Sequence, residues 1–197
     1  YFDQQAAVAE SQNPKMTIME DFWEEYPTLK EVEVRSALGS FLFSGDDVYK
    51  ELGQLSGGEK VRLALCKMFK RRPNLLILDE PTAGLDPAGR DEILGLVSKM
   101  HKELGITILL VSHSMEDVAE YVDRIIVMNH GAVMFDALPK QVFAHYKELE
   151  AVGLAAPQVT YLVHELAERG LPVDTQATTA KEAAQTILSA LREKNVI

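Results

Sequence analysis

The sequence contains few of the residues and segments that define several common classes of protein. Its 197 residues include one cysteine, Cys66, so no disulfide can form within the chain, which suits the reducing cytosol. No apolar run approaches the roughly 20 residues of a membrane-spanning helix, so we do not expect an integral membrane protein. The chain begins at Tyr1 without the basic and apolar leader of a secretory signal, and from this start we expect a fragment of a longer protein.

Positive charge is also scarce. The chain has a formal net charge of −10, and residues 1–54 contain 11 acidic residues against 4 basic ones. Proteins that bind a nucleic-acid backbone usually present a basic face, so direct nucleic-acid binding is not expected. The alternative is that Lys70, Arg71 and Arg72 form a local patch that binds nucleic acid. Such a trio is more commonly the solvated end of a helix, where basic residues complement the helix dipole.

The hydrophobic spacing predicts that helices alternate with short apolar strands. Helices are expected at residues 17–26, 28–42, 59–71, 87–104 and 114–122, and strands at 74–80 and 106–113, with a hairpin over 124–136. The order strand, helix, strand, helix, strand predicts an α/β fold with a parallel sheet and helices on its faces. Near-continuous apolar strands are typical of buried parallel sheets.

The last third of the chain has no strand pattern. After Leu138, helices are expected at residues 139–150, 157–169 and 179–193. We therefore predict two domains. Residues 1–138 would form the α/β domain, with a helical part at about 5–72 and a core at 73–138, and residues 139–197 would form a helical carboxyl-terminal domain.

Two short motifs carry chemistry. The strand "LLILDE" ends in Asp79 and Glu80, and the carboxyl ends of parallel strands are where ligands bind in open α/β sheets. One acid there could be a plain strand end, whereas two acids followed by Pro81 and Thr82 favour a Mg²⁺ ligand beside a general base. Upstream, "LSGGE" (residues 55–59) opens a helix with two glycines, which lets the backbone approach an anion. Alone, this turn would be only a helix cap.

The motifs "LSGGE", "LLILDEPTAGLDP" (residues 75–87) and "LLVSH" (109–113), in this order, resemble the signature, the Walker B motif with its D-loop, and the H-loop of ATP-binding cassette (ABC) ATPases. The resemblance implies a P-loop NTPase-like fold that uses ATP and Mg²⁺. It implies that Asp79 would bind Mg²⁺ through water, that Glu80 would activate the attacking water, and that His113 would contact the γ-phosphate. Asp86 would belong to the D-loop.

The same resemblance assigns the remaining site residues. In "YFDQ", Gln4 is similar to the Q-loop glutamine that senses Mg²⁺ and water. Ser56, Gly57, Gly58 and Glu59 would bind ATP held by an opposing subunit, in a head-to-tail dimer with a second ABC ATPase. A transmembrane coupling subunit is the other implied partner, which would place the chain at the cytoplasmic face of the membrane.

One part of such an enzyme is missing from the sequence. No lysine follows the glycine pattern of the Walker A loop, G-x-x-x-x-G-K-[ST], which cradles the phosphates. In ABC ATPases this loop precedes the Q-loop, and this chain begins at the Q-loop motif. We therefore expect a sheet without its Walker A part and no ATP binding in the chain's own pocket.

The two parts of the chain resemble different subfamilies. Residues 1–82 resemble the ABC-F proteins, which are soluble and associated with ribosomes, whereas residues 83–197 resemble the ATPase of energy-coupling factor (ECF) transporters for vitamins or metal ions. We interpret the chain as two parts joined near residues 75–83, either by natural recombination or by the assembly of two genes into one sequence. The alternative is a single divergent family that has both features. The favoured function is a partial ECF ATPase subunit. A ribosome-associated ATPase and a catalytically incomplete interaction module are the alternatives.

Overall fold

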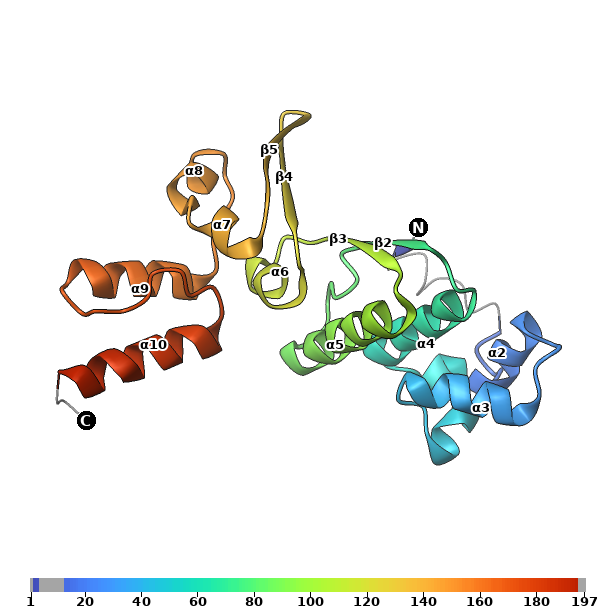
Figure 1. The fold of residues 1–197 in the computed structure, drawn as a ribbon. Helices are drawn as coiled ribbons and strands as arrows, with labels where there is room; N and C mark the ends of the chain where they lie inside the picture. Colours follow the sequence, from blue (N-terminus) through green and yellow to red (C-terminus); the bar gives the residue numbers. More distant parts are fainter. Residues whose placement is uncertain (1, 4–12, 195–197) are drawn as a thin grey trace. The chain divides into compact units, whose positions relative to one another are not determined.

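The computed structural model describes residues 2–3 and 13–194, which form two compact units, one ending at Val111 and one beginning at Ser112 (Figure 1). The predicted division lies at residue 138 instead, because the sequence pattern changes there from strands to helices. A compact unit is a group of residues that share a core, and it need not coincide with a domain. The domain boundary at residue 138 therefore stays a prediction.

The first unit contains a three-stranded sheet in the order β1-β2-β3, formed by β1 (Phe2–Asp3), β2 (Leu75–Asp79) and β3 (Thr107–Val111). Both pairings are parallel, as the sequence predicts, and Asp79 lies opposite Val111. The connection from β2 to β3 is the long helix α5 (Pro87–Leu104), whose bounds are those predicted. Asp86 caps its start and Gly105 ends it in the left-handed conformation.

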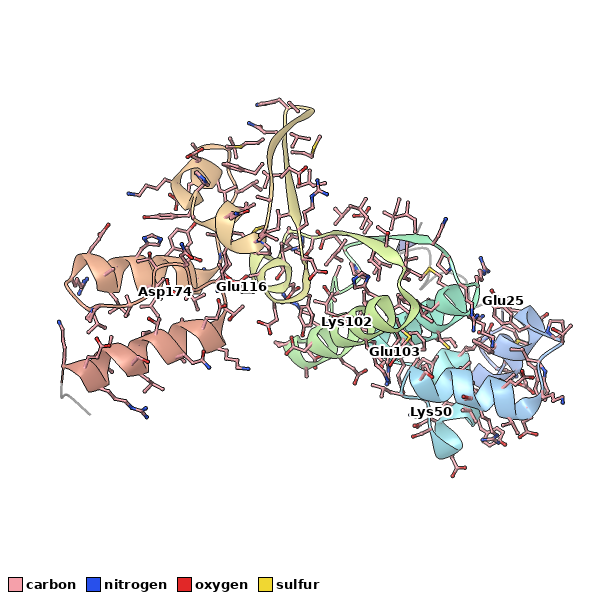
Figure 2. The ribbon with its side chains drawn as sticks, viewed as in Figure 1. Glu25, Lys50, Lys102, Glu103, Glu116 and Asp174 are labelled. Carbon is pink, nitrogen blue, oxygen red and sulfur yellow. The ribbon has the colours of Figure 1, made fainter. Side chains whose placement is uncertain are left out.

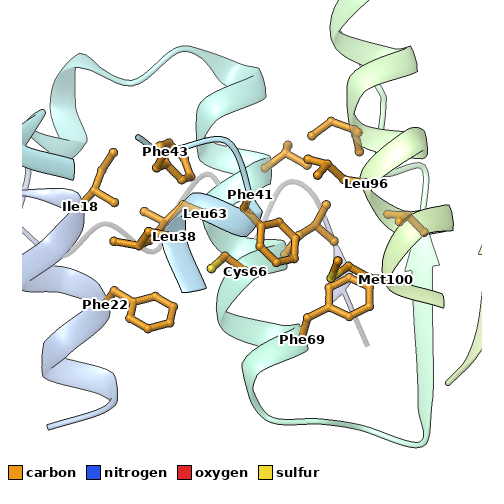
Figure 3. Packing of buried hydrophobic residues seen from close by; sticks show 14 of the residues in the cluster. Ile18, Phe22, Leu38, Phe41, Phe43, Leu63, Cys66, Phe69, Leu96 and Met100 are labelled. Carbon is orange, nitrogen blue, oxygen red and sulfur yellow. The ribbon is translucent and has the colours of Figure 1, made fainter. Parts of the chain in front are cut away.

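The other helices of this unit lie between β1 and β2 along the chain. They are α2 (Ile18–Glu25), α3 (Glu31–Ser40), the 3₁₀ turns η1 (Gly45–Tyr49) and η2 (Leu52–Gln54), and α4 (Gly57–Lys70). Each predicted helix is present: α2 and α3 are shorter than predicted by one to three residues at each end, whereas α4 begins two residues earlier and ends one residue earlier. Figure 3 shows how Phe22, Phe69 and Met100, from α2, α4 and α5, share one core.

The sheet is less buried than its apolar sequence predicts. Leu76 and Leu78 of β2 are buried in the same core as α4 and α5, whereas Leu75 and Leu109, on the opposite face, are about half exposed. The residues described by the structure place helices from this unit's core against one face only (Figure 1). The strands therefore alternate between buried and exposed positions, although their sequence is apolar throughout.

The second unit contains a hairpin and five helices among the residues that the structure describes. The elements are α6 (Met115–Tyr121), β4 (Ile125–Asn129), β5 (Ala132–Ala137), α7 (Pro139–Phe143), α8 (Tyr146–Ala151), α9 (Gln158–Glu168) and α10 (Ala180–Glu193). The predicted hairpin turns at His130 and Gly131, both with positive φ, which is the two-residue turn that fits strand twist.

Two expectations for this unit are wrong. The strand β4 does not extend the parallel sheet; in the described residues it pairs only with β5, antiparallel, and the hairpin packs with α7 and α8 around Phe143. The helix expected over residues 139–150 is two helices. His145 breaks it with a ψ of 32°, and its ring stacks on Phe135 at 5.0 Å between ring centroids.

Candidate functional site

The two acidic residues that follow the apolar strand lie at the carboxyl edge of the sheet. Asp79 is the last residue of β2, and the backbone N–H of Glu80 donates a hydrogen bond of 2.9 Å to the carbonyl oxygen of Val111 in β3. Both side chains are partly buried. These two consecutive residues thus lie at the edge where ligands bind in open parallel sheets.

Glu80 has a backbone conformation that is costly for an amino acid with a side chain. Its φ is 44°, in the left-handed region, where a non-glycine residue costs on the order of 1–3 kcal/mol. The turn that follows supports this conformation, since Ala83 N–H donates to the Glu80 carbonyl and Leu85 N–H to that of Thr82. Such strain concentrates at active sites, and it was not foreseen from the sequence because Glu has no special preference for this region.

The signature motif forms the start of α4, as the sequence predicts. Ser56 is the N-cap: its Oγ accepts from the Glu59 N–H at 3.3 Å, and Glu59 Oε2 accepts from the Ser56 N–H at 2.8 Å. This reciprocal pair is a capping box. The N–H groups of Gly57 and Gly58 lie in the first turn, where a helix has no internal acceptor for them.

The two glycines are not required by the packing of the unit. A methyl group added to Gly58 would meet nothing within 4 Å, and one added to Gly57 would make an ordinary 3.6 Å contact with Leu85. Neither glycine has a positive φ. Glycine in a helix costs about 1 kcal/mol relative to alanine, so the fold gains nothing from them. They leave a bare, open backbone at the helix N-terminus, which is the environment that anions favour.

Glu59 is already engaged within its own unit. Besides the Ser56 N–H, its carboxylate contacts Lys50 Nζ at 3.0 Å. Partial burial acts to raise the pKa of Glu59, but the hydrogen bonds from Ser56 and Lys50 outweigh this and lower it. A direct contact of Glu59 with nucleotide therefore stays a prediction, and the contact with Lys50, nine residues away, was missed by sequence reasoning.

The far end of α4 is tied to α2 by charge. Lys67 Nζ lies 2.5 Å from Asp21 Oδ2, and Arg71 pairs with Glu25 at 2.6 Å. The Tyr26 hydroxyl also donates to the Lys67 carbonyl at 2.7 Å. These contacts fix the direction of α4. Because Arg71 pairs with Glu25, this member of the basic trio Lys70, Arg71 and Arg72 has a structural role at the end of the helix.

Asp86 has a structural role in addition to its predicted place in the D-loop. Its Oδ1 accepts from the Gly89 N–H at 2.8 Å and so caps α5. A Cβ on Gly89 would lie only 2.9 Å from that oxygen, so a side chain here would force the Asp86 carboxylate to shift. The contact of Asp86 with nucleotide remains a prediction.

The other predicted site residues are placed less completely. His113 is exposed and belongs to the second unit, so its closeness to Asp79 and Glu80 stays a prediction. Gln4 lies outside the described residues. In the part of the chain that the structure describes, no three His, Cys, Asp or Glu side chains are grouped to hold a metal. Mg²⁺ at NTPase sites needs only one or two carboxylates beside substrate phosphates, so Asp79 fits such a role.

Described residues of the second unit line one cavity. A cavity of about 470 Å³ lies beside β5 and α7, and Lys140 and His145 are among its lining residues. Lys140 Nζ pairs with Glu182 at 2.6 Å and His145 Nδ1 with Glu148 at 2.8 Å, so both groups have partners in the protein. No helix in the described ranges is both long and apolar enough to cross a membrane.

Comparison with known proteins identifies the relatives of this chain. Residues 2–83 match the family model described as "ABC transporter". The chain is 46% identical over 151 residues to the energy-coupling factor transporter ATP-binding protein EcfA2 of Clostridium perfringens, covering 76% of this chain and 53% of that protein. It is 50% identical over 141 residues to the protein of that name from Clostridium tetani, with 72% and 49% covered. The chain spans about half the length of these curated relatives.

The similarity is not confined to the carboxyl-terminal part. EcfA2 of Acetivibrio thermocellus is 44% identical over 161 residues, 82% of this chain and 57% of that protein. Such a stretch leaves at most 36 of the 197 residues before it, so it crosses residues 75–83. The ABC-F resemblance of residues 1–82 and the join stay predictions.

A solved structure agrees in fold. The chain resembles cbiO1 of Clostridium perfringens, described as part of the ABC transporter complex cbiONQ, with a TM-score of 0.60 and 35% identity over 79% of this chain and 64% of that one. The α/β fold expected from the P-loop NTPase resemblance is thereby confirmed. The chain is therefore related to the ATP-binding cassette ATPases and carries their signature and Walker B motifs.

Proposed function

We propose that this chain is part of an ATP-binding subunit that powers uptake through an energy-coupling factor transporter, with a vitamin or a metal ion as cargo. The observation that carries the proposal is the pair Asp79 and Glu80 at the carboxyl edge of β2, with Glu80 held at a positive φ. The relatives that share this region are named ATP-binding proteins of such transporters.

The carboxylate pair would serve hydrolysis of ATP. Asp79 would hold Mg²⁺, which neutralises charge on the β- and γ-phosphates when it is bound. Glu80, one residue further along the chain, would accept a proton from the attacking water, a general-base role that is typically worth 10²- to 10⁴-fold in rate. The sequence has no Walker A loop, so this role requires a phosphate cradle from outside these residues.

The signature turn would serve a second nucleotide. Ser56 and the two glycines present a hydroxyl group and backbone N–H groups at the start of a 14-residue helix, and the positive end of the helix dipole lies there. These groups would bind the phosphates of ATP held by a second cassette in a head-to-tail dimer. That dimer would dock on a transmembrane coupling subunit at the cytoplasmic face of the membrane.

Association with a complete cassette tests the proposal. The chain is mixed with full-length EcfA2 of Clostridium perfringens that lacks hydrolytic activity, with and without Mg-ATP, and complexes are measured by analytical ultracentrifugation. We expect association that depends on Mg-ATP and is lost in Ser56→Arg, because the large cation blocks the turn. Ser36→Arg, at an exposed serine of α3, is the matched control and should associate normally. The proposal would be overturned if association were equal with and without Mg-ATP, or if Ser56→Arg associated as well as the wild type.

A further inference from the structure

The lysine at position 50 lies between the signature helix and the 3₁₀ turn that precedes it. Its Nζ is 3.0 Å from Glu59 Oε1 and 2.9 Å from Asp47 Oδ1 (Lys50 is labelled in Figure 2). The Glu59 side chain is largely buried, with 16% of its surface exposed, whereas the Lys50 side chain is 44% exposed. One ammonium group thus links η1 to the first turn of α4.

The backbone of Lys50 is itself held in place. Its carbonyl oxygen accepts from the Ile18 N–H at 3.1 Å, and the neighbouring residue Glu51 pairs with Thr17 in an isolated antiparallel bridge. Gly53 approaches Pro14 so closely that a Cβ would lie 3.0 Å from the Pro14 carbonyl oxygen. The ammonium group therefore extends from a backbone segment that is fixed against the start of α2. Its contact with Glu59 can restrain the position of that carboxylate.

The carboxylate of Glu59 in turn restrains Ser56, the first residue of the signature turn. One oxygen contacts Lys50, and the other accepts from the Ser56 N–H at 2.8 Å. The Ser56 hydroxyl oxygen accepts from the Glu59 N–H, which leaves the hydroxyl hydrogen available for an external acceptor. With Ser56 fixed by both of its groups, the following glycine N–H groups have a defined direction.

We propose that Lys50 is a positioning residue for the signature turn: by holding the Glu59 carboxylate, it orients Ser56, Gly57 and Gly58 toward the phosphates of an opposing nucleotide. This inference rests on the proposed function. Lys50 touches neither nucleotide nor the reacting atoms and acts through Glu59. Its ammonium also counters the negative charge that Glu59 would otherwise place beside an anionic ligand.

The first experiment follows the free chain and requires no nucleotide. Hydrogen exchange of the Ser56 amide is measured by NMR in the wild type, Lys50→Met, Lys50→Arg and Lys99→Met. Lys99 pairs with Glu103 on the exposed surface of α5 and provides the matched control. We expect Lys50→Met to exchange several-fold faster at Ser56, since a free Glu59 holds the cap less firmly, and Lys50→Arg to restore protection. Equal exchange in the wild type and Lys50→Met would overturn the inference.

The second experiment uses Mg-ATP-dependent association with full-length EcfA2. Lys50→Met should weaken association about 5- to 10-fold, in line with the loss of one helix cap, and Lys50→Gln provides a second neutral variant. In a Glu59→Gln background, Lys50→Met should cause no further loss, because the two residues act as one unit. A full additional loss in that background would overturn the inference.

A pH profile separates positioning from general stability. Because Lys50 helps to lower the pKa of Glu59, the carboxylate in Lys50→Met should become protonated at a higher pH. The loss of association on acidification should therefore begin at a higher pH than in the wild type, and an unshifted profile would contradict the role. If the wild type does not associate at all, the proposed function fails, whereas Ser56 exchange still tests Lys50.

Discussion

Glu80 combines a chemical group with a backbone conformation that favours glycine. Its φ of 44° is stabilised by its hydrogen bond to Val111 and by the turn that follows it. The carboxylate therefore extends from the sheet edge at a cost to folding. A residue that were only a strand end would have no reason to bear this cost, since glycine or asparagine would fit the same turn more easily.

Replacement of Glu80 by glycine should raise stability. We expect Glu80→Gly to increase the free energy of unfolding of the first unit by up to about 1 kcal/mol, because glycine adopts positive φ without strain. Glu80→Gln keeps the strain and should stay close to the wild type. Urea denaturation followed by fluorescence of Trp23, the single tryptophan, reports on this unit. A lower stability of Glu80→Gly than of Glu80→Gln would contradict the interpretation.

Two helical glycines should respond in opposite ways to an added methyl group. Gly58→Ala should stabilise the first unit by up to about 1 kcal/mol, because open space surrounds the new Cβ and alanine favours helix. It should also weaken Mg-ATP-dependent association, because the methyl group covers the bare backbone.

Gly89→Ala should instead destabilise the unit by about 0.5–2 kcal/mol, the cost of losing the Asp86 cap, because its Cβ would lie 2.9 Å from the Asp86 oxygen. Urea denaturation and ultracentrifugation measure the two quantities for both variants. A Gly58→Ala protein that is less stable than the wild type would show that the glycine serves the fold rather than a ligand.

At the scale of elements, α4 is the structural centre of the first unit. Its start is fixed by Ser56, Glu59 and Lys50, and its end by the pairs with Asp21 and Glu25. In its middle, Cys66 is buried and lies 3.4 Å from the carbonyl oxygen of Ala37 in α3. The signature helix is therefore held along its whole length, which is what a helix that aims its N-terminus at a ligand requires.

The burial of Cys66 makes the first unit sensitive to alkaline pH. Desolvation raises the pKa of this thiol from 9.0 to about 12. In the unfolded chain the thiol ionises above its ordinary pKa, whereas the folded state keeps its proton, so stability falls between about pH 9 and pH 12. The slope from this residue is about 1.4 kcal/mol for each pH unit.

Comparison with Cys66→Ala isolates this contribution. The variant should be less stable at neutral pH, because a buried sulfur is removed, and its stability should fall less steeply above pH 9. Urea denaturation followed by Trp23 fluorescence at several pH values measures the difference between the two slopes. Identical slopes for the two proteins would show that the thiol does not remain protonated in the folded state.

The local signals in the sequence predict most of this architecture, and the contacts between distant segments set the rest. Helix α5 has a capping aspartate, an early proline and a final glycine, and its bounds are predicted without error. The hairpin follows from His130 and Gly131. By contrast, the break at His145 depends on stacking against Phe135, and the exposed face of β2 depends on which elements surround it. Such effects leave no periodic signal.

The candidate site likewise has features that the local sequence predicts and features that depend on contacts between distant segments. Ser56, Asp79 and Glu80 are identified by type and order alone, because their motif is local. The positive φ of Glu80 is set by the ladder and the turn around it, and the contact of Lys50 with Glu59 depends on how η1 meets α4. Neither can be predicted from residue types at a given spacing.

At the scale of the whole molecule, each compact unit has a hydrophobic core of its own. The core of the first unit includes Phe22, Leu38 and Phe69, and that of the second includes Phe143 and Leu149. A further small cluster around Val163 joins α9 and α10. Separate cores allow separate cooperative transitions, so we expect each unit to unfold with a free energy of its own.

Reciprocal core variants test this independence. Phe22→Ala should destabilise the first unit by about 3–5 kcal/mol, because it leaves a cavity where a fully buried ring packs, and the Trp23 transition should move to lower urea. Hydrogen exchange of the α7 and α8 amides, followed by mass spectrometry, should stay unchanged. Phe143→Ala should accelerate exchange in α7 and α8 and leave the Trp23 transition in place. If either variant destabilises both units equally, the chain unfolds as one cooperative body, and the sheet edge at Glu80 would share its stability with the helices that follow β5.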